Sequence, residues 1–186
     1  ETKLELRQGS LDVPSKISVS PDGKLFAFSN SFTYFVYDEN LQFLFSNNIS
    51  NAPPISQSFP VVAYLNEQIL IPVPDKGVLI FKGQDLIQTI APVKFEEGKL
   101  FLPTNISATN SNIFLYDDLT GKINYYVYEN LKRSFPVNDI IGPILMTQSK
   151  IELNATKDGS LFIISIGVEL IIKKYNPQNG DVKTVK

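Results

Sequence analysis

ISVSPDGKLFAFSNSFTYFVYDENLQFLF, at residues 17–45, is the stretch of sequence that decides the fold. Short runs rich in β-branched and aromatic residues alternate in it with breaks that hold Pro, Asp, Gly, Ser or Asn. Such runs favour strands, and such breaks supply the residues that tight turns need. The stretch therefore predicts four short antiparallel strands, at residues 17–20, 24–28, 32–37 and 41–45.

The rest of the chain repeats this plan loosely. Comparable units follow at residues 61–90, 93–128 and 150–185, and polar loops are expected at residues 46–58 and 103–111. No segment shows a sustained apolar period of 3.6 residues with caps, so we expect less than about one-tenth helix. The sequence predicts a single all-β domain at residues 17–186, an antiparallel meander of about four four-stranded units. An N-terminal strand or arm, at residues 1–16, precedes it.

Short motifs recur in these units. DGKLF at residues 22–26 matches EGKLF at 97–101 and DGSLF at 158–162, with NEQIL at 66–70 as a weaker copy. VYD at 36–38, LYD at 115–117 and KYN at 174–176 recur before the last hairpin of three units. An SPDG turn, an apolar strand and a later Tyr-Asp turn together resemble a blade of a β-propeller of the WD40 or YVTN type. The resemblance implies sheets that stack radially, with both faces of each sheet buried.

The motif copies also predict core positions. Asp-Gly supplies the positive φ of a tight hairpin, and the Leu-Phe pair that follows places one side chain on each face of a strand. We therefore expect six side chains to be mostly buried: Leu25, Phe26, Leu100, Phe101, Leu161 and Phe162.

The spacing of the motifs leaves a second architecture open. The Asp/Gly turns fall unevenly, whereas a regular propeller keeps about 40–45 residues per blade. Four units are also few for such a ring, and a half-ring would leave two apolar sheet faces bare, which is typical of an interface. Either the ring closes with four units, or another chain completes it, or the meander is a two-layer β-sandwich.

The composition excludes many kinds of chemistry. The chain has no Cys and no His, so disulfides, His/Cys zinc sites and His-dependent triads cannot form. A net charge of −2 gives no basic footprint for nucleic acid, and the longest apolar run, residues 161–172, is too short to cross a bilayer as a helix. We expect no enzyme activity, no cofactor or metal, no nucleic-acid partner and no membrane insertion. The acidic turn DDLTG at 117–121 resembles a calcium loop faintly, and we interpret it as a hairpin turn.

Three Asn-x-Ser/Thr sequons occur, at Asn48, Asn105 and Asn154. The first two fall in the expected polar loops, and Asn154 falls at a strand end beside a turn. A glycan can stand in water at such places. We therefore expect all three side chains to be exposed and at least one to carry an N-linked glycan.

The favoured function is that of a non-enzymatic extracellular β-protein that works through protein contacts, with copies of itself or another β-protein as partner. Its composition resembles archaeal secreted surface proteins, including filament subunits that lend a strand to a neighbour. The strand-competent arm places Leu4 and Leu6 on one side, where they would fill apolar slots of an acceptor sheet. Repeated head to tail, such strand exchange builds a self-assembling filament or surface layer.

Two other functions stay open. One is a scaffold segment of a larger intracellular β-propeller, which would place the chain in the cytoplasm. The other is a carbohydrate-active β-protein, which needs two carboxylates that converge in one pocket. The extracellular hypothesis assumes that a signal peptide has been removed, since the sequence begins at Glu1.

Overall fold

The structure is a computed structural model in which four antiparallel sheets and one short helix are described. The described residues are 16–20, 23, 25–29, 33–48, 63–65, 67–73, 76–91, 102–109, 111–142 and 150–185. Sheet 1 contains β1 (Lys16–Val19), β2 (Leu25–Ser29), β3 (Thr33–Asp38) and β4 (Phe43–Asn48). Sheet 2 contains β5 (Ala63–Leu65), β6 (Gln68–Val73), β7 (Gly77–Lys82) and β8 (Asp85–Ile90).

The second half of the chain has the same organisation. Sheet 3 contains β9 (Pro103–Thr109), β10 (Asn112–Asp117), β11 (Lys122–Val127) and β12 (Asn130–Pro136). The helix α1 (Asn138–Ile141) follows it. Sheet 4 contains β13 (Lys150–Ala155), β14 (Leu161–Ile166), β15 (Leu170–Tyr175) and β16 (Val182–Thr184). Each sheet is a meander, because its strands pair in the order in which they occur in the chain.

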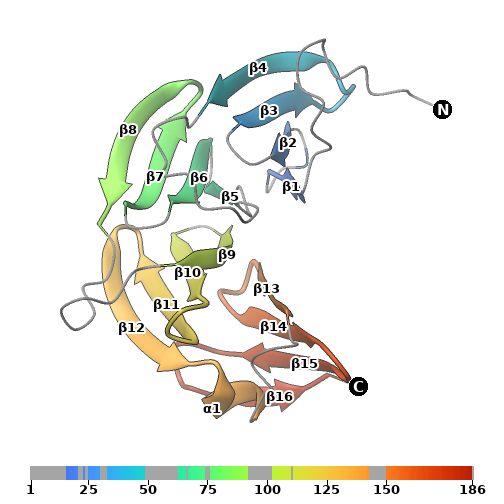
Figure 1. Ribbon diagram of the computed structural model, residues 1–186, viewed down its shortest axis with the longest axis vertical. Helices are drawn as coiled ribbons and strands as arrows, with labels where there is room; N and C mark the ends of the chain where they lie inside the picture. Colours follow the sequence, from blue (N-terminus) through green and yellow to red (C-terminus); the bar gives the residue numbers. More distant parts are fainter. Residues whose placement is uncertain are drawn as a thin grey trace.

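The four sheets follow one another around an arc (Figure 1). The first strand of each sheet lies on the inside of the arc and the last strand on the outside, while sheets 1 and 4 lie at its two ends. Sheet 3 packs face against face on sheet 2 and on sheet 4. The chain is therefore propeller-like and does not form a two-layer sandwich.

Among the described residues, two apolar cores lie between the sheets, and side-chain alternation along the strands explains them. In β10, Ile113 and Leu115 point to sheet 2, while Phe114 and Tyr116 point to sheet 4. The core between sheets 2 and 3 contains Leu70, Val78, Ile80, Ile90, Ile106, Ile113, Leu115 and Tyr126. The core between sheets 3 and 4 contains Phe114, Tyr116, Ile123, Tyr125, Phe135, Val137, Ile140, Ile141, Ile151, Leu153, Leu161, Ile163 and Tyr175. Sheet 3 is thus covered on both faces.

The glycines of two Asp-Gly turns have the expected backbone, while Asp22 of the first turn lies outside the described residues. Gly23 has φ of +76° and Gly159 has φ of +80°, values that favour glycine. The Gly159 amide donates to the Thr156 carbonyl oxygen over 2.9 Å. A Cβ at Gly159 would lie 3.2 Å from Asn112 Nδ2, so a side chain here would be both strained and crowded.

The third unit is displaced from the expected range of residues 93–128. The segment expected as a polar loop is strand β9, and residues 130–136 form β12, so sheet 3 covers residues 103–136. The second strand of sheet 3 is therefore β10, and the EGKLF motif at 97–101 does not supply it. The expected strands at 93–95 and 99–102 lie outside the described residues, except that Leu102 is described and is not in a strand. Polar β9 residues can be buried because they bond to sheet 4, as shown below.

Of the six side chains that we expected in the core, the structure describes two. Leu161 is fully buried and Phe162 is half-buried. The side chains of Leu25 and Phe26, and the whole of Leu100 and Phe101, lie outside the described part of the chain. Within the described ranges α1 is the only helix, in agreement with the expected low helix content.

Candidate interaction surface

One face of sheet 4 is apolar and has no sheet packed on it among the described residues. In β14, Leu161, Ile163 and Ser165 are buried on the side of sheet 3, so the alternate residues point the opposite way. The strand register places β15 residues directly beside those alternate residues. We call this surface the open face of sheet 4, and it consists of Phe162, Ile164, Ile166, Leu170 and Ile172.

The exposure of this face is unusual for so many large apolar side chains. Leu170 is 66% exposed and Ile166 is 47% exposed, while Phe162, Ile164 and Ile172 are half-buried. Apolar side chains gathered on one face, rather than scattered singly, are typical of an interaction site. The open face of sheet 4 is therefore the main candidate surface of the described chain.

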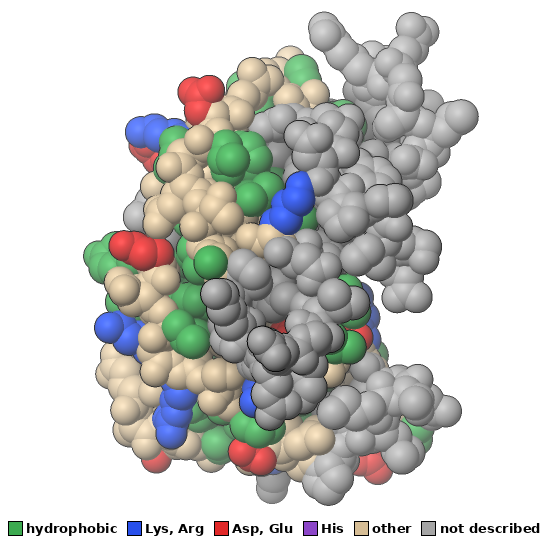
Figure 2. Space-filling model, turned by 60° about the vertical axis from the view of Figure 1, so that its left-hand side comes forward, with side chains coloured by type: hydrophobic (Ala, Val, Ile, Leu, Met, Phe, Trp, Pro, Cys, Tyr) green, Lys and Arg blue, Asp and Glu red, His purple; other side chains and the backbone are tan. Residues whose placement is uncertain are grey.

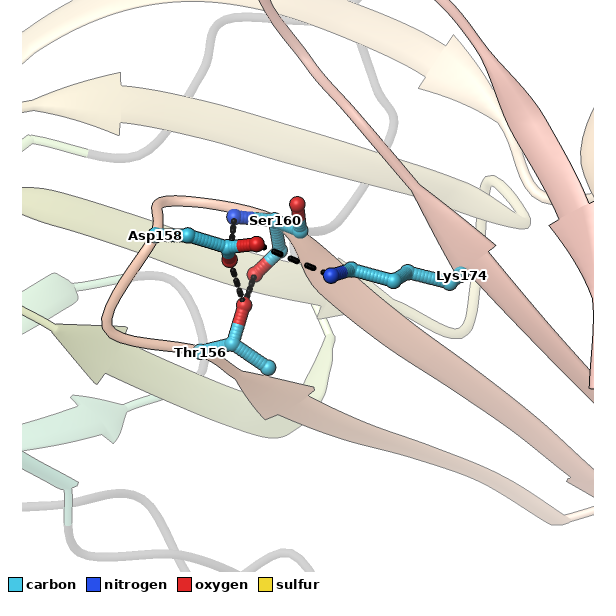
Figure 3. Close-up of polar contacts among 4 residues, drawn as sticks. All are labelled: Thr156, Asp158, Ser160 and Lys174. Atoms are coloured by element: carbon cyan, nitrogen blue, oxygen red, sulfur yellow. Dashed lines mark hydrogen bonds and ion pairs between the residues drawn. The ribbon is translucent and has the colours of Figure 1, made fainter.

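A polar cluster borders this face (Figure 3). Lys174 Nζ lies 2.8 Å from Asp158 Oδ2, and its ammonium group lies 5.9 Å from the centroid of the Phe162 ring. Asp158 Oδ1 accepts hydrogen bonds from Thr156 Oγ1 and, over 3.1 Å, from the Ser160 amide. Lys174, then Thr156 and the Ser160 amide, hold the pKa of the Asp158 carboxyl well below its usual value.

We expect this cluster to make stability depend on acid pH. Because the pKa of Asp158 is lower in the folded chain, its stabilisation is present above the ordinary aspartate value of about 3.9 and is lost as the pH falls further. Thermal unfolding of the native sequence and Asp158→Asn, followed from pH 7 to pH 2, checks this. The midpoints should differ at pH 7 and converge toward pH 2. Asp85→Asn, at an exposed position of β8, is the matched control for the charge change, and an undiminished gap at pH 2 would contradict the prediction.

The outer surface of the arc differs from the open face of sheet 4. Figure 2 shows small, separate hydrophobic groups there, interspersed with charged and other polar side chains. Leu86, Ile87 and Leu131 are exposed on the outer strands β8 and β12. Apolar residues scattered in this way are ordinary on protein surfaces.

Asn105, one of the three sequon residues, is buried, so the prediction that it is exposed was wrong. Its side chain is 2% exposed and joins β9 to β13. Asn105 Nδ2 donates to Glu152 Oε2 over 2.6 Å and to the Ile151 carbonyl over 3.3 Å, and Asn105 Oδ1 accepts from the Leu153 amide over 3.4 Å. The side-chain amide thus bonds to β13 much as a neighbouring backbone would. A folded chain has no room for a glycan at this nitrogen.

The other expected site residues have different positions. Asn154 is exposed in β13, and its register partner is Phe162 of the open face of sheet 4. Asn48 ends β4, and its side chain lies outside the described part of the chain. Leu4 and Leu6 also lie outside it.

In the acidic turn at residues 117–121, the Asp117 carboxylate accepts hydrogen bonds from groups of the turn and from the Leu102 amide. Asp117 is fully buried, and its Oδ1 accepts from the Leu102 amide over 3.0 Å and from the Leu119 amide over 3.2 Å. Its Oδ2 accepts from Thr120 Oγ1 over 2.8 Å. These donors support the interpretation as a hairpin turn. Among the described residues no group of three or more Asp or Glu side chains could hold a metal ion, and no helix is long and apolar enough to cross a membrane.

Comparison with solved structures identifies the fold. The chain is similar to the WD40 β-propeller domain of Doa1, with a TM-score of 0.63 and 12% identity over 96% of this chain and 55% of that one. It is similar to U3-55K, with a TM-score of 0.63 and 9% identity over 95% of this chain and 53% of that one. It also matches the computationally designed Ika4 protein, with a TM-score of 0.55 and 12% identity over 100% and 98% of the two chains.

These likenesses show an all-β, propeller-like fold in which each four-stranded sheet is a blade. The chain spans about half the length of the Doa1 and U3-55K chains that it matches. No protein-family model and no curated protein matches the sequence.

Proposed function

We propose that this chain is a non-enzymatic β-protein that acts through protein–protein contacts, with copies of itself or another β-protein as its partner. The open face of sheet 4 carries the proposal. It presents five large apolar side chains on two adjacent strands. Sheet 3 packs on sheet 2 and on sheet 4 through apolar faces of the same kind. A partner that supplies another apolar sheet face would remove this surface from water in the same way.

We place the protein outside the cell or on the cell surface. Asn154 is an exposed sequon asparagine and can accept a glycan, and Asn48 is the second candidate. In its assembling form the N-terminal arm adds a strand to a neighbour, with Leu4 and Leu6 in apolar slots. These features together describe a cell-surface or filament subunit.

A second candidate function is a scaffold segment of a larger intracellular β-propeller. The observation that favours it is the coverage of 55% and 53% of the two propeller chains. Further blades of the same polypeptide would then cover the open face of sheet 4. This candidate predicts a longer natural chain without sugar.

Cross-linking in the native source tests the proposed function. Amine-reactive cross-linking followed by peptide mass spectrometry should join Lys150 or Lys183, which are exposed on sheet 4, to another protein molecule. Lys132, which is exposed on the outer strand β12, is the internal control and should give few such links. The intact mass of the same material should show added hexose masses. Cross-links confined to one molecule would contradict the contact function, and an unmodified mass would contradict the location.

A further inference from the structure

We propose that the open face of sheet 4 binds the equivalent face of sheet 1 in a second copy, so that two arcs close one ring. This inference rests on the proposed function and names its partner. Three observations support it. Sheet 4 repeats the apolar face that sheet 3 buries against sheet 4, and sheet 1 repeats the apolar face that sheet 4 buries against sheet 3. The third observation is the length of the arc.

First, the open face of sheet 4 repeats a face that is covered elsewhere. In sheet 3, Phe114 pairs with Tyr125, and their rings stack 4.9 Å apart beneath sheet 4. The corresponding pair in sheet 4 is Phe162 and Lys174. Below these pairs, Tyr116 with Ile123 in sheet 3 corresponds to Ile164 with Ile172 in sheet 4. Sheet 4 therefore presents the side that sheet 3 buries against its next neighbour.

Second, sheet 1 presents the complementary side. In sheet 4 the side packed on sheet 3 includes the row Ala155–Leu161–Tyr175. In sheet 1 the register gives the row Val19–Phe26–Tyr37 in the same place, and Ile17 lies one row further along. We call the surface formed by Ile17, Val19, Phe35, Tyr37 and Phe43 the open face of sheet 1.

The open face of sheet 1 is apolar, and three of its five residues, Ile17, Val19 and Phe43, are exposed. Ile17 is 62% exposed and Val19 is 50% exposed. Tyr37 is buried, and its ring contacts the Phe43 ring edge to face with centroids 5.8 Å apart. In the interface between sheets 3 and 4, the open face of sheet 4 thus corresponds to the side that sheet 3 supplies. The open face of sheet 1 corresponds to the side that sheet 4 supplies.

Third, the length of the arc leaves room for a second copy. The chain corresponds to 55% and 53% of the length of two propeller chains, so two arcs together supply about one whole ring. Contacts between unlike faces generate a closed ring when the rotation between copies closes, and an open filament when it does not. The four sheets of one chain follow one another around an open arc (Figure 1), so a second arc can continue the same curve and bring the unlike end faces together.

Lys174 suits a face that is exposed to water in a single copy and covered in the ring. It occupies the register position of the buried Tyr125 of sheet 3. A lysine stem covers apolar surface while its ammonium group stays in water, and Asp158 pairs with that group at the border of the face. A single copy can therefore stay folded until it meets its partner.

The ring has a consequence for Asn154. This asparagine is paired with Phe162 on the open face of sheet 4, so a glycan there would stand between the two copies. Closed rings should therefore be unmodified at Asn154. Chains that carry sugar at this residue should remain monomeric.

Sedimentation equilibrium of the 186-residue chain tests the ring. We expect the mass of two copies of the 20.8 kDa chain. Leu170→Asp places a charge on the open face of sheet 4, and Ile17→Asp places one on the open face of sheet 1. Each variant should raise the dissociation constant about 30-fold or more, as expected when a charge replaces an apolar hot-spot residue of an interface. Leu86→Asp is the matched control, since Leu86 is 53% exposed on an outer strand, and it should remain dimeric.

Mixing the two variants gives the sharpest outcome. A mixed pair keeps one intact junction, between sheet 4 of the Ile17→Asp chain and sheet 1 of the Leu170→Asp chain. The mixture should therefore associate more tightly than either variant alone. Circular dichroism confirms that each variant is folded, and Phe43→Asp, which is 40% exposed in β4, replaces Ile17→Asp if that variant does not fold.

Four results would overturn the ring: a monomeric native chain, a dimer that survives Leu170→Asp, no rescue on mixing, or larger open assemblies. A monomer that still forms intermolecular cross-links in the native source would overturn the ring and leave the proposed function standing. A chain without intermolecular cross-links of any kind would overturn both.

Discussion

Phe114→Ala is expected to lower the free energy of unfolding by about 3–5 kcal/mol, which is the usual cost of removing a buried phenylalanine ring. Phe114 is fully buried between sheets 3 and 4. Its ring stacks on Tyr125 at an interplanar angle of 13°, so the substitution removes both apolar burial and an aromatic pair. The cavity cannot collapse easily, because strands border it on both sides.

Urea unfolding followed by circular dichroism measures this effect. The total stability of a domain is about 5–15 kcal/mol, so the change should be a large share of it. Leu86→Ala is the control, since Leu86 is 53% exposed, and it should change the free energy of unfolding by about 0.5 kcal/mol or less. A loss below about 1 kcal/mol for Phe114→Ala would show that sheets 3 and 4 do not pack as described.

Asn105→Ala is expected to cost about 2–4 kcal/mol, because buried polar groups would lose their partners. The substitution leaves the Ile151 carbonyl and the Leu153 amide without the bonds that the Asn105 side chain makes. It also removes the donor to Glu152 Oε2. Since these bonds join the inner strands of sheets 3 and 4, the loss should weaken the contact between the two sheets.

Thermal unfolding compares this variant with Asn130→Ala, which removes an exposed asparagine at the start of β12 and should be nearly neutral. Asn105→Asp adds a further check. It replaces the donor beside Glu152 with a second carboxylate, so it should be more damaging at pH 7 than at pH 4. Equal stability of Asn105→Ala and the native chain would refute the structural role of this amide.

The strands and many turns could be predicted from the sequence because local chemistry determines them. Alternating apolar runs favour strands wherever they occur, and Gly23 and Gly159 have the positive φ that their Asp-Gly turns require. The propeller-like organisation followed from repeated hairpins of similar length. A choice against the sandwich needed the relative placement of the sheets, which depends on contacts between distant residues.

The residue range of sheet 3 was predicted incorrectly because its first strand contains several polar residues. PTNISAT, at residues 103–109, has the composition of a loop, but Asn105 and Ser107 bond to β13. A usable signal lay further along the chain. VYENL at residues 127–131 resembles VYDENL at residues 36–41, and both occupy the hairpin between the third and fourth strands of a sheet. That match would have placed β11 and β12 correctly.

The open face of sheet 4 could not be identified from the sequence. LFIISI at residues 161–166 is apolar at nearly every position, a pattern that indicates cover on both faces of a strand. The element that covers the second face can belong to the same chain or to a partner. No local sequence pattern distinguishes these two cases.

The meander within each sheet has a consequence for how the chain folds. Paired strands are consecutive in the sequence, so native contacts form through short loops and the entropic barrier to each of them is small. Sheet 3 shares a core with both of its neighbours and is the best place for a nucleus to grow from. Amide hydrogens of the fully covered strand β10 should exchange slowest, and those of the exposed strand β16 should exchange first. Order would then spread outward along the arc and reach its two ends last.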